Sequence, residues 1–228
     1  MGGGCSGGMT GSKDARALLV PAAVFVVTAL LASRDRLLFG EAGLVEALNG
    51  NAILGAFPVE PALLGIMAIG TLLGIAGVTV GAALRLRPWQ APVAVAAAGL
   101  LGWFTSRLAK ELVGRGRPVE FLDARTLDIS GGYASITGAG FPSGHATIAF
   151  AMATALVPWL PARFRWVPWV VASIVAVARV YVAAHFPLDV IGGAALGMLL
   201  GGLVNLALPA TGITGTWTAT AITPVSGT

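Results

Sequence analysis

Apolar stretches long enough to cross a bilayer recur along this chain, and they constrain its fold more than any other feature. Six are evident: 17–33, 62–84, 91–104, 146–160, 167–184 and 190–208. Because about 20 apolar residues in a helix match the hydrocarbon core of a bilayer, we interpret the six stretches, with their flanks, as spanning helices. A composition of 56% hydrophobic and 11% charged residues excludes an ordinary soluble domain. The sequence predicts an all-α integral membrane protein with six transmembrane helices in one bundle.

Two features of these stretches leave alternatives open. The third and fourth stretches are short enough to be re-entrant or buried helices instead of spans. The first resembles a signal peptide, because Lys13 and Arg16 precede it and Ala32 and Ser33 close it, but the spans behind it favour a retained anchor. The predicted organisation is a flexible cytoplasmic tail over 1–16, a six-helix transmembrane domain over 17–208, and a second flexible cytoplasmic tail over 209–228.

The distribution of basic residues predicts which side each loop faces. Six spans place the N-terminus, the second and fourth connections and the C-terminus on one side of the membrane. That side holds one acidic residue, Asp14, and the basic residues Lys13, Arg16, Arg85, Arg87, Arg163 and Arg165. Short loops rich in Lys and Arg stay in the cytoplasm, so this side is predicted to be cytoplasmic. The net charge of +4 is then a topology signal and does not indicate nucleic-acid binding.

Glycines spaced three or four residues apart mark two of the predicted spans. Residues of this size let helices approach closely. The glycines are Gly70, Gly74, Gly77 and Gly81 in the second span, and Gly193, Gly197 and Gly201 in the sixth. We expect a packing role for them and assign them no chemistry.

The polar residues that are unusual in a membrane protein lie in two connections on the predicted extracytoplasmic side. Arg179 stands out because it interrupts the apolar stretch 167–184, where an unpaired Arg is costly and therefore faces a partner or a wet cavity. The alternative is snorkelling towards the nearby helix end. Lys110 and Arg117 lie seven residues apart, and the glycines and proline around Arg117 predict a bend in the backbone there.

A second cluster begins at the start of the fourth span. Ser143 is placed to cap that helix, and the unpaired N–H groups of a helix start, Gly144 among them, form an anion site. An ordinary turn and cap is the alternative. His145 stands beside this start and can give a proton to the leaving oxygen of a bound anion. If the sixth helix begins near His185, the carboxylate of Asp189 can accept the imidazole Nδ1–H and leave Nε2 as a nucleophile.

Together these residues resemble the three signature motifs of the type-2 phosphatidic acid phosphatase superfamily. The motifs are Lys-x6-Arg-Pro at 110–118, Pro-Ser-Gly-His at 142–145 and Arg-x5-His-x3-Asp at 179–189. The order and spacing also agree, over a layout of about 60–208. The resemblance implies a six-helix core and a metal-independent phosphomonoester or pyrophosphate hydrolase that needs no cofactor and forms a phosphohistidine.

Carried over by position, the resemblance gives each motif residue a role. It implies that His185 attacks phosphorus, that Asp189 orients His185, and that His145 protonates the leaving group and then activates water. The residues implied to hold the phosphate oxygens are Lys110, Arg117, Ser143, Gly144 and Arg179. The family usually has Ser immediately before the third-motif Arg, whereas this chain has Ala178, so one hydroxyl contact is missing.

A site at the outer mouth of a helical bundle can take a head group while the lipid tail stays in the membrane, so the expected partner is a lipid phosphate in a bacterial plasma membrane. Undecaprenyl pyrophosphate is the leading substrate; phosphatidylglycerol phosphate, phosphatidic acid and diacylglycerol pyrophosphate follow. Head-group selection is expected in 119–140 and in the first outer loop, with Glu41, Glu46 and Glu60. Alternatives are a lipid phosphotransferase and, in another class, a transporter or channel that uses the same polar residues. The sequence does not determine the oligomeric state.

Overall fold

The computed structural model describes residues 15–34, 37–49, 59–87, 89–122, 138–208 and 210 of the 228-residue chain. Helices and their connections make up this part, and no strand occurs in it. The helices are α2 (Leu19–Ala32), α3 (Glu41–Asn49), α4 (Val59–Ala68), α5 (Leu72–Arg85), α6 (Gln90–Val113), α7 (Pro118–Phe121), α8 (Gly144–Leu156), α9 (Val167–Tyr181) and α10 (Pro187–Ala207), with short 3₁₀ turns η2 (Val157–Trp159) and η3 (Ala162–Phe164) after α8.

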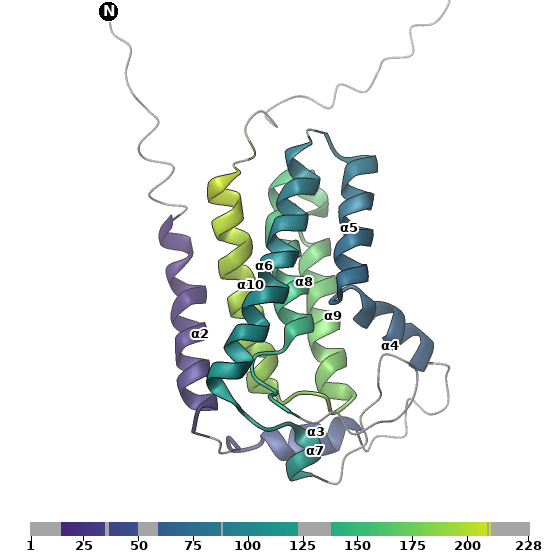
Figure 1. Ribbon diagram of the computed structural model, residues 1–228. Helices are drawn as coiled ribbons and strands as arrows, with labels where there is room; N and C mark the ends of the chain where they lie inside the picture. Colours follow the sequence, from purple (N-terminus) through teal and green to yellow (C-terminus); the bar gives the residue numbers. More distant parts are fainter. Residues whose placement is uncertain are drawn as a thin grey trace, which may run out of the picture.

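The helix α8 lies at the centre of a bundle formed with α6, α9 and α10 (Figure 1). Its sequence is apolar or small on every side, as expected for a helix surrounded by other helices. The helix α2 packs mainly on α10, and α5 packs on α6. This central position puts the first residues of α8 at the end of the bundle where α3 and α7 lie (Figure 1).

The glycines of the sixth predicted span have the expected packing role. A methyl group on Gly197 would stand 2.4 Å from the carbonyl oxygen of Thr147, and one on Gly201 would stand 2.5 Å from that of Ala151. These positions therefore let α10 lie directly against α8. In the second predicted span, Gly77 and Gly81 do not have this packing role, because a methyl group on either would meet nothing within 4 Å.

The second apolar stretch is not the continuous helix that 62–84 predicts. It is broken between α4 and α5, which are bent by 74°. Thr71 is the N-cap of α5 and accepts a hydrogen bond from Gly74 N–H at 3.2 Å. A methyl group on Gly74 would lie 2.2 Å from the carbonyl oxygen of Ile69, so this glycine permits the sharp bend. The capping threonine and the glycine three residues later therefore determine the backbone here, although the apolar pattern favours one continuous helix.

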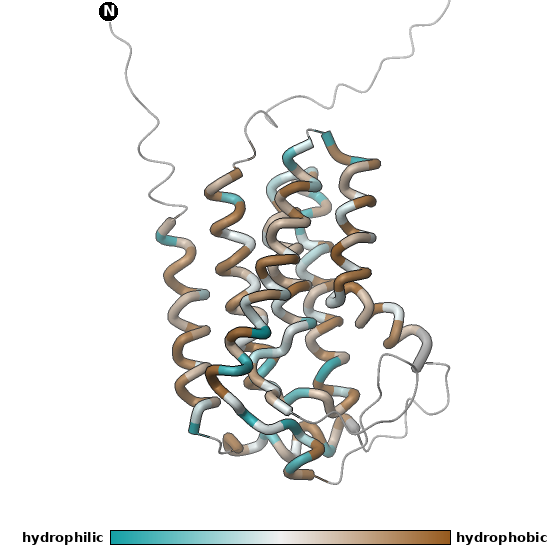
Figure 2. Tube along the Cα trace, viewed as in Figure 1, coloured by the Kyte–Doolittle hydropathy of each residue, from teal (hydrophilic) through white to brown (hydrophobic). Residues whose placement is uncertain are grey.

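Four described helical segments are long and apolar enough to span a membrane, and five are if the bent pair counts as one. They are Ala15–Ala32, Gln90–Phe121, Ala162–Tyr181 and Pro187–Ala207, with Ala62–Ala68 and Leu72–Arg85 as the bent pair. The fourth predicted stretch, α8, has only 13 residues. Brown, apolar residues run along the helices in Figure 2, and teal, hydrophilic residues collect at the end with α3 and α7. The chain is therefore a multi-pass helical membrane protein.

Candidate active site

The first part of the site is the C-terminal end of α6. Lys110 lies in the last turn, and Gly114 ends the helix in the left-handed conformation at φ +68°, as glycine commonly does. The chain then runs extended at Arg117 and enters α7 with Pro118 in the first turn. The predicted bend between Lys110 and Arg117 is confirmed, and it lets both side chains turn towards the start of α8.

Lys110 and Arg117 meet on one short segment, residues 138–140, just before the second motif. Lys110 Nζ donates to the carbonyl oxygens of Ala139 and Gly140 at 2.8 and 3.2 Å. Arg117 donates from Nε to the carbonyl oxygen of Gly138 at 3.1 Å, and from a terminal nitrogen to that of Ala184 at 3.1 Å. Because Ala184 precedes His185, Arg117 joins the first motif to the third.

The second part is the start of α8, where the peptide bond between Phe141 and Pro142 is cis. Ser143 occupies the N-cap position as predicted, but its hydroxyl makes no capping hydrogen bond. Its Oγ is buried and has no hydrogen-bond partner among the described residues, and the same holds for Nε2 of His145. Ser143 N–H donates to the carbonyl oxygen of Asp189 at 2.9 Å, which fixes the start of α8 against α10. Both unpaired atoms are therefore available to a ligand.

The third part is the turn between α9 and α10. Arg179 is 4% exposed in the last turn of α9, and its terminal nitrogen lies 3.3 Å from the sulfur of Met67. The chain folds back at once, because the N–H groups of Ala184 and His185 both donate to the carbonyl oxygen of Arg179, at 3.1 and 3.3 Å. This is the turn that the sequence requires to bring Arg179 and His185 to one site.

The residue before Arg179 takes part in packing. Ala178 is 2% exposed and packs against Met67, Val182 and Ala184. A serine at this position would enter an apolar cluster, so the chain uses the site for packing where the family usually has a hydroxyl.

His185 and Asp189 lie next to each other at the start of α10, which begins at Pro187. The distance from His185 Nδ1 to Asp189 Oδ2 is 3.5 Å, and the geometry does not meet hydrogen-bond criteria, so the predicted hydrogen bond is a looser contact. The same Oδ2 accepts from Phe186 N–H at 2.9 Å. The 2% exposed His185 and the fully buried Asp189 are both shielded from water.

The electrostatic surroundings of His185 show that the cations converge. Its pKa lies well below its ordinary value, first because burial penalises the charged imidazolium, and then because Lys110, Arg117 and Arg179 are close. The same three cations act on His145. His185 is therefore held as the neutral imidazole, the form with a free lone pair. The structure brings the candidate residues of the three motifs together at one end of the bundle.

The sequence analysis missed one residue of the site, Arg115, and gave another, Glu41, a different role. Arg115 is 1% exposed and bridges Asp189 and Glu41, with its terminal nitrogen 2.9 Å from Asp189 Oδ1. Glu41, expected to select head groups, is instead buried in this ion pair. Arg115 lies between two glycines inside the first motif, so the sequence alone could have identified it as a candidate site residue. Nothing in the sequence indicated the partner of Glu41. Much of 119–140 and Glu60's side chain lie outside the part that the structure describes.

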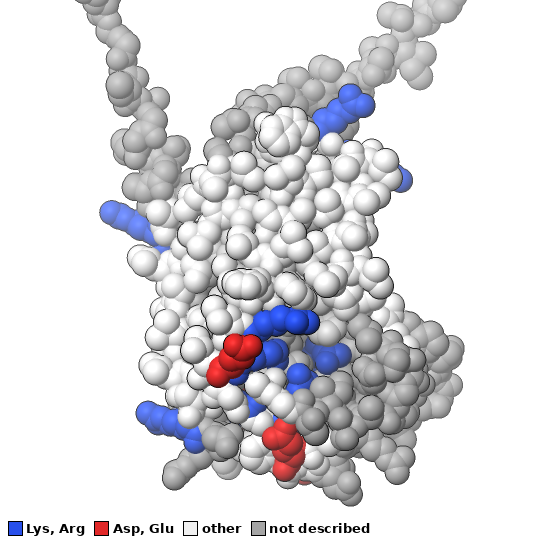
Figure 3. Space-filling model, viewed as in Figure 1, with Lys and Arg blue, Asp and Glu red and all other residues white. Residues whose placement is uncertain are grey.

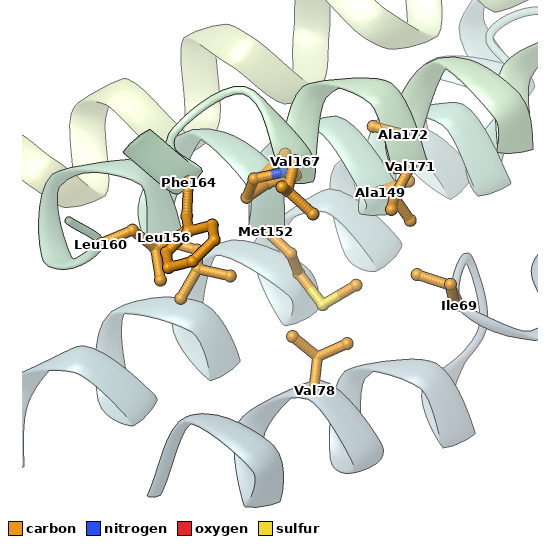
Figure 4. Close-up of a pocket in the computed structure, with 12 residues that line it drawn as sticks. Ile69, Val78, Ala149, Met152, Leu156, Leu160, Phe164, Val167, Val171 and Ala172 are labelled. Atoms are coloured by element: carbon orange, nitrogen blue, oxygen red, sulfur yellow. The ribbon is translucent and has the colours of Figure 1, made fainter. Parts of the chain in front are cut away.

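Two cavities differ in chemistry. One of about 480 Å³ is lined by Arg107, Lys110, Glu111, Arg117 and Ala139, so it shares two cations with the site. Figure 3 shows basic and acidic side chains gathered around a hollow in the lower half of the visible face, and an uncharged band directly above it. The other, of about 400 Å³, is lined by apolar residues of α5, α8 and α9 and neighbouring turns, such as Val78, Met152 and Phe164 (Figure 4). Only the first cavity offers groups for an anion.

Fold and site together define a multi-pass helical membrane protein with a buried, cationic site that carries two histidines and suits a phosphate group. A model of the PAP2 superfamily matches residues 87–212, more than half of the chain. The chain belongs to this superfamily, and the resemblance drawn from the motifs is confirmed.

Individual relatives agree with this assignment. The first transmembrane PAP2 type phosphatidylglycerolphosphate phosphatase from Bacillus subtilis is 24% identical, with a TM-score of 0.62, over 81% of this chain and 94% of that one. LpxE of Aquifex aeolicus is 20% identical, with a TM-score of 0.60, over 71% and 92%. YbjG of Escherichia coli (strain K12), which bears the name "putative undecaprenyl-diphosphatase", is 39% identical over 59 residues, which is 26% of this chain and 30% of that protein. The match therefore spans less than a third of that relative's length.

Proposed function

We propose that this protein hydrolyses a lipid phosphate or pyrophosphate without a metal ion, through a phosphohistidine intermediate, and that undecaprenyl pyrophosphate is its substrate. The observation that carries the proposal is the convergence of Lys110, Arg117 and Arg179 on His185, which is buried, and on His145, which is half-buried with its Nε2 shielded from water. Phosphoryl transfer depends mainly on positioning and on stabilising charge at the phosphate oxygens, and three cations supply both. The partial match to YbjG supports the choice of lipid.

The residues divide the reaction into two steps. In the first, the neutral imidazole of His185 forms a bond to phosphorus and the bond from phosphorus to the leaving oxygen breaks. His145, protonated in the complex because the phosphate's negative charge offsets the three cations, gives that oxygen a proton. In the second, His145 takes a proton from water, which attacks phosphorus and releases His185. Lys110, Arg117, Arg179, the hydroxyl of Ser143 and the N–H of Gly144 hold the phosphate oxygens, and Asp189 orients His185. A placed histidine contributes about 10²- to 10⁴-fold to such proton transfers.

The proposal includes six spans, with α4 and α5 forming one broken span and the buried α8 another. It places the site at the extracytoplasmic end and the tails 1–16 and 209–228 in the cytoplasm. Supporting this orientation, α5 ends at Arg85 and η3 contains Arg163, at connections remote in sequence from the site motifs. A reporter fused after Thr228 tests the orientation, and an extracytoplasmic reporter would reverse it.

The substrate class is tested with purified protein and a panel of lipid phosphates. The panel holds undecaprenyl pyrophosphate, phosphatidylglycerol phosphate, phosphatidic acid and diacylglycerol pyrophosphate, and the measurement is release of inorganic phosphate. We expect the highest kcat/KM on undecaprenyl pyrophosphate, no loss with EDTA and inhibition by vanadate. Activity abolished by EDTA and restored by a divalent cation would contradict the metal-independent mechanism.

The nucleophile is tested by His185→Ala, which we expect to abolish phosphate release and covalent labelling by a ³²P-labelled substrate. His145→Ala provides the contrast, because its nucleophile remains and only proton transfer is lost. With an aryl phosphate, whose leaving group needs no proton, this variant is expected to accumulate an acid-labile, base-stable phosphoenzyme. Arg163→Met, at a cation outside the site, is the control and retains full turnover. Normal turnover by His185→Ala would exclude His185 as the nucleophile.

A further inference from the structure

A buried ionic chain connects the first loop to the catalytic pair. It runs from Glu41 in α3 through Arg115 to Asp189 in α10, and the exposed fractions of the three residues are 6%, 1% and 0%. Arg115 contacts Glu41 Oε2 with one terminal nitrogen and Asp189 Oδ1, at 2.9 Å, with the other. In the part of the chain that the structure describes, Arg115 and Glu41 form no hydrogen bond or ion pair with either histidine, so they act on the site through Asp189.

The contacts of Asp189 show what Arg115 fixes. Its Oδ2 accepts from Phe186 N–H at 2.9 Å and faces His185 Nδ1 at 3.5 Å. Its Oδ1 is held by Arg115. A carboxylate held by both oxygens cannot rotate about its terminal bond, so the oxygen that faces His185 stays in place. Without Arg115 this orientation would depend on one backbone hydrogen bond.

Glu41 holds both Arg115 and the start of α10. Its Oε1 accepts from Leu188 N–H at 3.1 Å, which is one of the unpaired N–H groups of the first turn of α10. Its Oε2 accepts from Leu38 N–H at 2.9 Å and from Arg115. The guanidinium carbon of Arg115 also lies 5.0 Å from the centre of the Phe186 ring, within cation–π range. These contacts fix the guanidinium from three sides.

The buried charges explain why Arg115 needs both carboxylates, Glu41 and Asp189, and why they need it. The two carboxylates are separated by a single guanidinium, and all three groups are buried. Removing the arginine leaves two uncompensated buried carboxylates, which is strongly destabilising, whereas neutralising a carboxylate at the same time relieves part of that cost. A glutamine at Glu41 keeps one acceptor oxygen for the N–H groups and removes the charge.

We propose that Arg115 and Glu41 are positioning residues that hold the Asp189 carboxylate against His185. The proposal rests on the hydrolase function proposed above. Because neither residue lies among the groups that hold phosphate, their loss lowers kcat and leaves KM unchanged. Removing a group that orients a metal ligand typically costs about 10- to 100-fold, and we expect a loss in kcat of the same order for these two residues.

The test is a double-mutant cycle of Arg115→Met and Asp189→Asn, measured as kcat and KM for lipid phosphate hydrolysis. If Arg115 acts through Asp189, the double variant is no slower than Asp189→Asn alone within about twofold, although each single change costs about 10- to 100-fold. Arg115→Lys keeps the charge and one contact, so we expect an intermediate kcat at unchanged KM. Glu41→Gln is expected to lower kcat less than Arg115→Met does.

The folded fraction of each variant is measured by thermal unfolding and size exclusion, and kcat is expressed per folded molecule. If Arg115→Met does not fold, Arg115→Lys and Glu41→Gln form the cycle with Asp189→Asn. Multiplicative losses in the cycle, or a kcat per folded molecule equal to wild type in the single variants, would overturn the proposal. Its failure differs from failure of the proposed function, which appears as an inactive wild type or as an active His185→Ala.

Discussion

Gly197 lies where α10 meets α8, and Gly197→Ala is expected to destabilise the bundle. The added methyl carbon would stand 2.4 Å from the carbonyl oxygen of Thr147, 2.9 Å from the amide nitrogen of Ala151 and 2.9 Å from the Cβ of Phe150. Ordinary contacts begin at 3.4 Å, so the two helices would have to separate. Two of the three atoms belong to backbone, which cannot move aside as a flexible side chain can.

The magnitude follows from two opposing effects. Overpacking of this kind costs about 1–3 kcal/mol. Alanine in place of glycine favours a helix by about 1 kcal/mol. Gly77→Ala in α5 is the matched control, because it gains the same helix preference and its methyl group meets nothing within 4 Å. The two variants should therefore differ by the overpacking cost alone.

Thermal unfolding of the purified protein in detergent provides the measurement. A cost of about 1–3 kcal/mol corresponds to a Tm about 2–12 °C lower for Gly197→Ala than for Gly77→Ala, since each kcal/mol shifts Tm by about 2–4 °C in a domain of 150–250 residues. Equal Tm values for the two variants would refute the close approach of α8 and α10 at this position.

Three further predictions concern catalysis. Lys110→Met removes a cation near His185, so the pKa of His185 rises and the fall of kcat/KM at low pH begins at a higher pH. If that fall stays at the same pH, a group other than His185 causes it. Gly70→Ala places a methyl group 2.7 Å from the Cα of His145, so kcat should fall, and a kcat equal to that of Gly77→Ala would contradict this. Ser143→Ala should raise KM and leave Tm unchanged, because the hydroxyl has no partner in the described residues; a drop in Tm would point to a structural bond instead.

The sequence predicted which motif residues meet at one end of the bundle better than it predicted the arrangement of the helices around them. Lys110, His145 and His185 were identified from motifs that chemistry constrains tightly, because phosphoryl transfer needs those side chains at those spacings. Arg115 was visible in the same motif but had no evident role. Its partner Glu41 lies 74 residues away in the chain, and such a pairing depends on tertiary packing that no local pattern records.

The missed break between α4 and α5 has a similar cause. Hydrophobicity averages over 62–84 and favours a single span, whereas the backbone responds to Thr71 and Gly74 individually. The glycines at 77 and 81 share the spacing of those in α10 but face no neighbour in the described chain. Spacing alone indicates that a close approach is possible, and the partner surface determines where it occurs.

The shortness of α8 determines how deep the site lies in the bilayer. With 13 residues in α8 and 3 in η2, the segment rises about 25 Å, against about 30 Å for the hydrocarbon core of a bilayer. If its far end reaches one boundary of that core, Ser143 and His145 lie about 5 Å below the other. In the proposed orientation, the polar cavity lined by Lys110 and Arg117 would then admit water to the depth of the lipid's first carbons. On the proposed function, a lipid phosphate would react there without being lifted out of its leaflet.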